Sequence, residues 1–189
     1  HDKWMLLDVP GLGKTLQLIY LAQELKQKRG LEHCLVICGL NTLKTNWEKE
    51  ILKHSDLSCT ILGKRINRKG KVIFEGMSSR LNQLQNPIEE FFVITNIETL
   101  RDNRIVKAIL NGPNKFDMIV LDEAHVCKNS TSQQGENLLK LNKAFISSLV
   151  ISDIFLILSK KLVNIIIVSS FMSLFCFSLS KNSLILSLK

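Results

Sequence analysis

The chain has 189 residues, of which 46% are hydrophobic and 22% charged, and its net charge is +8. This length suits one domain with a sizeable core, and these proportions exclude a wholly disordered chain. Five scattered cysteines, with Cys34 and Cys38 inside one apolar run, favour packing over metal ligation or a disulfide framework.

Short apolar runs alternate with amphipathic segments along most of the chain. Strands are expected at residues 3–8, 34–38, 59–62, 71–74, 91–95 and 116–121. Helices are expected from residue 14 to the Gly30 stop, then at residues 43–53, 78–86, 96–110 and 132–145. A basic turn, residues 63–70, separates the third and fourth strands. This alternation predicts an α/β fold with a mostly parallel sheet and helices on both faces, and such sheets bind ligands beyond the carboxyl ends of their strands.

The segment DVPGLGKT, residues 8–15, follows the first strand and ends as a phosphate-binding loop does. Small residues let backbone N–H groups turn toward a phosphate, a lysine binds the β- and γ-phosphates, and a threonine hydroxyl reaches Mg²⁺. The residues expected to bind the nucleotide are Pro10, Gly11, Leu12, Gly13, Lys14 and Thr15. The alternative is an ordinary strand-to-helix turn that contains glycine and lysine.

The segment DEAH, residues 122–125, follows the last apolar strand. Asp122 is expected to hold the Mg²⁺ that Thr15 also contacts, and Glu123 to act as the catalytic base for the attacking water. Two adjacent carboxylates at a buried strand end need a cation to neutralise them. The alternative is an exposed turn with solvated charges. Because both motifs fall at the same edge of the expected sheet, together they favour Mg–nucleotide binding.

Four segments carry a resemblance to a known family: DVPGLGKT, CLVICGLNTLKTNWEKEI, FFVITNIETLR and MIVLDEAHVCKN. In this order they resemble helicase superfamily two, and more narrowly the SWI/SNF-type DNA-dependent ATPases. The phosphate loop of that family typically reads Asp-Glu-x-Gly-Leu-Gly-Lys-Thr, so Asp8 matches and Val9 departs from it. Trp47, Glu50 and the pair Lys128-Asn129 also match the family.

The resemblance implies a RecA-like first motor lobe over residues 1–146 that binds ATP and Mg²⁺ and tracks along double-stranded DNA, in the cytoplasm or on the nucleoid. It also implies that His125 couples the nucleotide site to neighbouring motifs. The residues that it places along the DNA are Asn41, Thr42, Lys44 and Thr95.

Each of these residues has a plainer alternative. Thr42 would cap a helix, Lys44 would be a solvated surface charge, and Trp47 is expected to pack in the core. A cluster of five cations is expected to be a solvated loop, with contact to phosphates as the alternative. The cluster consists of Lys64, Arg65, Arg68, Lys69 and Lys71.

Residues 147–189 form an atypical hydrophobic tail with no Gly or Pro and one acidic residue. The family continues at this point with a further strand, a Gly-Thr-Pro type motif and a second RecA-like lobe, and none of these is expected here. Residues 162–180 hold 19 uncharged residues, the length of a membrane span. A soluble buried helix and an out-of-frame sequence are the two other interpretations.

The function expected is therefore that of the ATP-binding lobe of a DNA-stimulated, helicase-like ATPase that is nearly inactive without its second lobe. The alternatives are an AAA-type ATPase, or a nucleotide-binding or membrane-anchored regulatory module that does not hydrolyse ATP. The 108-residue step from Lys14 to Asp122 argues against the AAA-type alternative.

Overall fold

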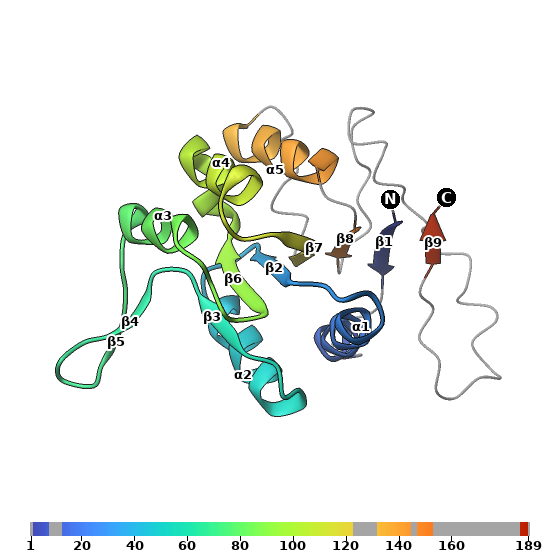
Figure 1. The fold of residues 1–189 in the computed structure, drawn as a ribbon, viewed down its shortest axis with the longest axis horizontal. Helices are drawn as coiled ribbons and strands as arrows, with labels where there is room; N and C mark the ends of the chain where they lie inside the picture. The colour runs from blue at the N-terminus through green and yellow to red at the C-terminus, as the bar shows by residue number, and fades with distance from the viewer. Residues whose placement is uncertain (1, 8–12, 123–131, 145–146, 153–185, 189) are drawn as a thin grey trace.

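The computed structural model describes residues 2–7, 13–122, 132–144, 147–152 and 186–188 (Figure 1). The strands are β1 Asp2–Leu7, β2 His33–Cys38, β3 Cys59–Ile61, β4 Lys64–Ile66, β5 Val72–Phe74, β6 Phe92–Asn96, β7 Phe116–Asp122, β8 Ser147–Ser152 and β9 Leu186–Leu188. The helices are α1 Lys14–Arg29, α2 Leu43–His54, α3 Met77–Gln85, α4 Asn103–Asn111 and α5 Gln133–Ala144, with a 3₁₀ helix η1 at Ile97–Arg101.

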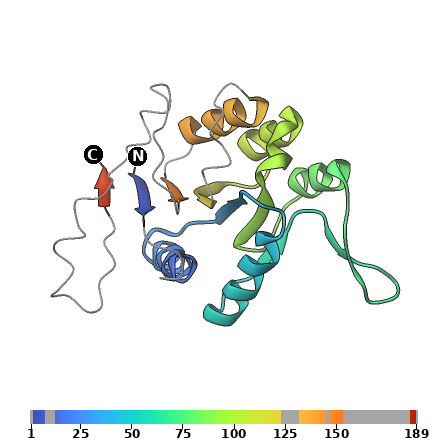
Figure 2. The ribbon, with the colours of Figure 1, turned by 180° about the vertical axis from the view of Figure 1, so that it is seen from behind.

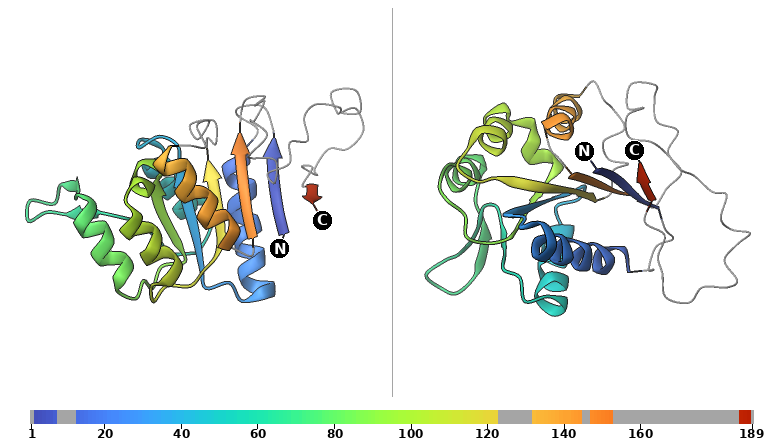
Figure 3. Two further views of the ribbon diagram at one scale, coloured as in Figure 1. Left: turned by 90° about the horizontal axis from the view of Figure 1, so that it is seen from above. Right: turned by 45° about the vertical axis from the view of Figure 1, so that its right-hand side comes forward.

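Seven strands form one sheet in the order β3-β6-β2-β7-β8-β1-β9. Every neighbouring pair from β3 to β1 is parallel, and β9 pairs antiparallel with β1 at the edge. Helices α1 and α2 cover one face, and α3, α4 and α5 cover the other (Figure 3). The expected α/β fold with a mostly parallel sheet and helices on both faces is confirmed.

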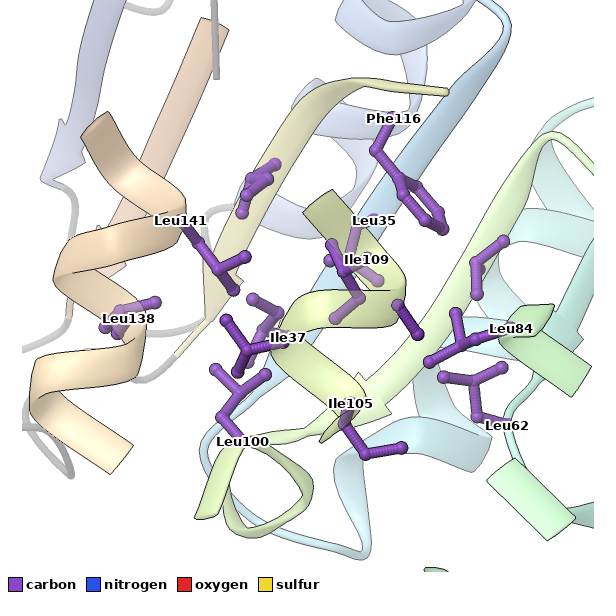
Figure 4. Close-up of a cluster of buried hydrophobic side chains, with 14 of the residues drawn as sticks. Leu35, Ile37, Leu62, Leu84, Leu100, Ile105, Ile109, Phe116, Leu138 and Leu141 are labelled. Carbon is purple, nitrogen blue, oxygen red and sulfur yellow. The ribbon is translucent and has the colours of Figure 1, made fainter. Parts of the chain in front are cut away.

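Both faces of the central strands are buried, which explains their uninterrupted apolar sequence. In β2, Leu35 and Ile37 pack against α4 and α5 in one cluster, whose leucine and isoleucine side chains interlock (Figure 4). The alternate residues Cys34, Val36 and Cys38 face α1 and α2 in the second cluster. Each buried Leu or Ile contributes about 1.5–3 kcal/mol relative to an exposed one, so the fold depends on both layers.

Three sequence expectations need correction. Part of the expected basic turn is a strand, because Lys64–Ile66 pairs antiparallel with Val72–Phe74 to form the β4–β5 hairpin. The single helix expected after β6 is divided into η1 and α4, since Asp102 caps α4 by accepting the Arg104 N–H. The boundary expected after residue 146 lies too early, because β8 pairs with both β7 and β1 inside the sheet.

The rest of the expected tail lies mostly outside the described residues, including the candidate membrane span at 162–180. Among the helices that the structure describes, none combines the length and the apolar character needed to cross a bilayer.

Asn114 joins the turn before β7 to the loop after α3. Its side-chain oxygen accepts the Ile88 N–H at 2.7 Å, and its amide donates to the Leu84 and Asn86 carbonyls at 2.9 and 3.0 Å. Replacing the buried Asn114 with alanine removes these three hydrogen bonds and leaves the Leu84 carbonyl without this partner in a buried place, so we expect a loss of about 1–3 kcal/mol in the free energy of unfolding. Urea denaturation measures this loss, and Asn111→Ala on an exposed position of α4 serves as the control. Equal stability of the two variants would contradict the bridging role.

Candidate nucleotide site at the carboxyl edge of the sheet

The carboxyl ends of the central strands form a level edge. Asp122 of β7 pairs with Cys38 of β2, and Cys38 pairs with Asn96 of β6, so these three residues share one row. On the other side, Leu121 and Met5 both pair with Val150 of β8. Asp122 is therefore level with the residue after Met5, close to the end of β1.

The end of β1 leads toward the phosphate-loop segment, and β8 separates β1 from β7. Two steps of inter-strand spacing put the ends of β1 and β7 about 10 Å apart, within reach of one triphosphate group. The sheet order therefore brings the end of β1 and Asp122, the first residue of the second motif, to neighbouring positions on one edge.

Helix α1 begins at Lys14, directly after Gly13. Gly13 has a positive φ of 74°, which a residue with a side chain rarely adopts, and the carbonyl of Gly13 accepts the first helical N–H, from Gln17. No acidic residue lies in the first turn of α1. The N-terminal amides and the positive dipole end of the helix thus suit an anion, and the Lys14 side chain, which is only 9% exposed, stands at the first helical position.

Asp122 is held by a group from α2. The Trp47 indole Nε1–H donates to Oδ2 of Asp122 at 2.7 Å, and the Gly39 N–H donates to the Asp122 backbone carbonyl at 2.9 Å. Trp47 is only 2% exposed, which confirms the expected packing role. This hydrogen bond could not be predicted from the sequence, because nothing local connects two residues 75 positions apart.

Cys38 lies beside Asp122 in the same row but does not share its chemistry. Burial raises the pKa of the Cys38 thiol, and the Asp122 carboxylate raises it further. Both effects disfavour the thiolate form of Cys38. This agrees with the packing role expected for Cys34 and Cys38, both of which are buried. Within the described residues, no group of His, Cys, Asp and Glu side chains forms a cluster able to hold a metal ion.

The four residues expected along DNA divide into two pairs. Asn41 and Thr42 are exposed just before α2, where Thr42 occupies the N-cap position but makes no side-chain capping bond. Lys44 and Thr95 are each 1% exposed, so contact with DNA would require their surroundings to move. The alternative of Lys44 as a solvated surface charge is therefore wrong.

Lys44 instead belongs to a buried polar region at the base of the β4–β5 hairpin. Its Nζ lies 4.7 Å from the centre of the Phe74 ring and has no hydrogen-bond partner among the described residues. Its pKa is lowered by burial and then by the nearby Arg80 guanidinium. Arg80 itself donates to Thr99 at 2.7 Å and to Asn96 at 3.4 Å, which fixes the turn after β6. Arg80 has no signal in the local sequence, because its role depends on contacts between α3 and η1.

Several expected site residues lie outside the described residues. They are Pro10, Gly11, Leu12, Glu123 and His125. The described donor set still fits Mg–ATP: Lys14 and the N-terminus of α1 suit the phosphates, and the oxygens of Thr15 and Asp122 suit Mg²⁺, which prefers hydroxyl, carboxylate and water oxygens.

Residues 2–148 match the family described as the SNF2-related domain. One relative, named ATP-dependent helicase fft2, from Schizosaccharomyces pombe, is 30% identical over 142 residues, which cover 75% of this chain and 10% of that protein. Another, from Onion yellows phytoplasma and named Phenylalanine--tRNA ligase alpha subunit, is 30% identical over 132 residues, which cover 66% of this chain and 37% of that protein. The two names describe different activities, so the names alone assign none.

A solved structure, the Sulfolobus solfataricus SWI2/SNF2 ATPase core in complex with dsDNA, has a TM-score of 0.57 and 24% identity. The similarity covers 80% of this chain and 28% of that chain, and it shows a shared fold. This chain thus spans between 10% and 37% of the length of these three proteins. Because the family match extends over most of the chain, the protein belongs to the SNF2-related domain family, a family of ATP-hydrolysing, helicase-like enzymes with a RecA-like core.

Proposed function

We propose that this chain is the ATP-binding lobe of a DNA-stimulated motor, which binds ATP with Mg²⁺ at the carboxyl edge of its sheet. The observation that supports this most is the order of three strands in the sheet. Strand β1, which precedes α1, and strand β7, which ends at Asp122, lie on either side of β8. When bound, Mg²⁺ would neutralise the negative charge of the phosphates and of the groups around the attacking water. Lys14 would bind phosphate oxygens, Thr15 and Asp122 would hold the metal, and Glu123 would accept the proton of the attacking water.

We also propose that this chain alone binds Mg–ATP but hydrolyses it slowly. By the resemblance to SWI/SNF-type ATPases, a second RecA-like lobe supplies the arginines that complete the ATP site, and we take the residues of this chain as the first lobe. Positive charges aimed at the transition state contribute several orders of magnitude to phosphoryl transfer, so their absence would leave binding largely intact while reducing turnover. Rapid DNA-stimulated turnover by this chain alone would contradict this part of the proposal.

Double-stranded DNA is the proposed partner of the assembled motor. The support is the family and the exposed loop before α2, in which Asn41 and Thr42 stand at the same edge as the nucleotide site. Backbone and hydroxyl groups at the start of a helix are suited to phosphate contacts that position DNA without reading its sequence.

The Asp122→Asn variant tests the metal site. Asparagine keeps an oxygen that can accept the Trp47 N–H but loses the charge that attracts Mg²⁺, so we expect Mg²⁺-dependent binding of a fluorescent ATP analogue to weaken about tenfold. Binding measured in EDTA should be equally weak in both proteins, because no metal is then present. Asp56→Asn at an exposed position is the matched control. Unchanged Mg²⁺ dependence in Asp122→Asn would refute the assignment of Asp122.

A further inference from the structure

The β4–β5 hairpin stands away from the body of the fold, beyond the β3 edge of the sheet (Figures 1 and 2). It leaves the sheet just after β3 and returns just before α3. None of its residues belongs to either core cluster, and neither the nucleotide site nor the packing of the sheet accounts for it.

The base of the hairpin is anchored. Lys64 donates to both carboxylate oxygens of Glu48 on α2 at 2.6 Å, and Arg65 pairs with Glu75 at 3.0 Å. The Gly63 N–H donates to Gln83 of α3 at 2.7 Å, and the Phe74 ring lies against Lys44. These contacts on two helices hold the direction of the arm and neutralise the two cations nearest the body.

The tip of the hairpin is ordered by one asparagine. Oδ1 of Asn67 accepts the N–H groups of Lys69 and Lys71, both at 2.9 Å, and the Asn67 carbonyl accepts the Gly70 N–H at 2.9 Å. Gly70 adopts a positive φ of 74°, which completes the turn. A turn that is shaped before binding loses little conformational entropy when a partner contacts it.

The tip carries cations that have no counterion in the described part of the chain. Arg68, Lys69 and Lys71 are exposed and make no ion pair there, in contrast to Lys64 and Arg65 at the base. Between residues 66 and 74 the sequence has no acidic residue. The arm therefore presents three unpaired positive charges on a preformed turn.

We propose that the β4–β5 hairpin is an arm that contacts the backbone phosphates of duplex DNA through Arg68, Lys69 and Lys71. This inference rests on the proposed function for its partner. The position of the arm favours DNA over other polyanions, because its base packs on Lys44 and Glu48, near the N-terminus of α2, which follows the exposed loop at Asn41 and Thr42. Loop and arm together would hold the duplex at two separate points.

The test compares two triple variants of the whole chain. Arg68→Gln/Lys69→Gln/Lys71→Gln removes the tip charges, and Lys49→Gln/Lys53→Gln/Lys107→Gln removes three exposed charges on α2 and α4. Affinity for a fluorescein-labelled duplex is measured by anisotropy between about 50 and 200 mM salt. Circular dichroism establishes that both variants are folded.

The tip variant should bind the duplex roughly tenfold more weakly at low salt. The slope of its log affinity against log salt should be smaller in magnitude by about 2–3, because each lost phosphate contact lowers that slope by about 0.9. The control variant should retain a slope close to that of the unmodified chain. Equal slopes for the tip and control variants, or binding of the unmodified chain to phosphatidylserine vesicles and not to duplex, would overturn the inference.

Nucleotide binding separates this inference from the proposed function. Both triple variants should bind the fluorescent ATP analogue as the unmodified chain does. Nucleotide binding without any duplex binding would contradict the proposed DNA contact of the hairpin and would not affect the proposed nucleotide site. Duplex binding that depends on the tip cations, without nucleotide binding, would support the proposed DNA contact of the hairpin and contradict the proposed nucleotide site.

Discussion

Replacing Lys14 with methionine is expected to weaken the binding of Mg–ATP by about 10- to 100-fold. The Lys14 ammonium stands at the first position of α1, after the left-handed Gly13, where the helix dipole already favours phosphate. A hydrogen bond to a charged group contributes about 1.5–3 kcal/mol, which corresponds to this range of dissociation constants. Methionine keeps the length of the buried stem, so the change removes the charge with little loss of packing. Titration with a fluorescent ATP analogue measures the effect.

The matched control is Lys107→Met, because Lys107 is exposed on α4, on the opposite face of the sheet from α1. It should bind the analogue as the unmodified chain does. Thermal denaturation without nucleotide should give similar midpoints for the two variants. If Lys14→Met bound Mg–ATP with undiminished affinity, the N-terminus of α1 would not be the phosphate site.

Replacing Trp47 with alanine is expected to lower the free energy of unfolding by about 3–5 kcal/mol, the range for truncating a large buried aromatic residue. The Trp47 ring fills the layer between α1, α2 and the sheet, and its N–H is bonded to Asp122. Small domains have only about 5–15 kcal/mol of stability, so this one change would bring the fold close to unfolding. Urea denaturation followed by circular dichroism measures the loss. Tyr20→Ala, at a position 54% exposed on α1, should change stability by less than about 0.5 kcal/mol.

Trp47→Phe separates packing from hydrogen bonding. Phenylalanine keeps most of the ring contacts but cannot donate a hydrogen bond to Oδ2 of Asp122. The loss of this bond should lower the free energy of unfolding by about 1–3 kcal/mol. If the indole positions the carboxylate for Mg²⁺, Trp47→Phe should also raise the Mg²⁺ concentration needed for nucleotide binding. A purely structural role would lower stability and leave that concentration unchanged.

Local sequence was sufficient to predict α1 and the strands β1, β2, β6 and β7 around the nucleotide site, but not β8, which lies between β1 and β7. The apolar runs of β2, β6 and β7 are uninterrupted because both of their faces are buried, and the spacing of Leu18 and Ala22 along α1 matches the helical period. The placement of Lys14 and Asp122 at one edge followed from a general property of parallel sheets.

Residues whose roles depend on distant partners were not predictable in the same way. Lys44 is a charged residue on an amphipathic helix, but it is buried in the fold, with Phe74 of the β4–β5 hairpin against it. Arg80 acquires its hydrogen bonds from η1, and Trp47 acquires its bond to Asp122 across 75 residues. Hydrophobic periodicity reports which face of an element is buried, but it carries no information about which distant group meets that face.

The sequence by itself determined the α/β class, the start of α1 after Gly13, and the two motifs that mark the nucleotide edge. Only the tertiary structure decided that β8 lies between β7 and β1, and hence how far apart the ends of β1 and β7 are. It also decided that the basic segment pairs with residues 72–74 as a projecting hairpin and that Lys44 is buried beneath it. The physical reason is that helix and strand formation depend on neighbours along the chain, whereas strand order and side-chain burial depend on contacts between segments far apart in sequence.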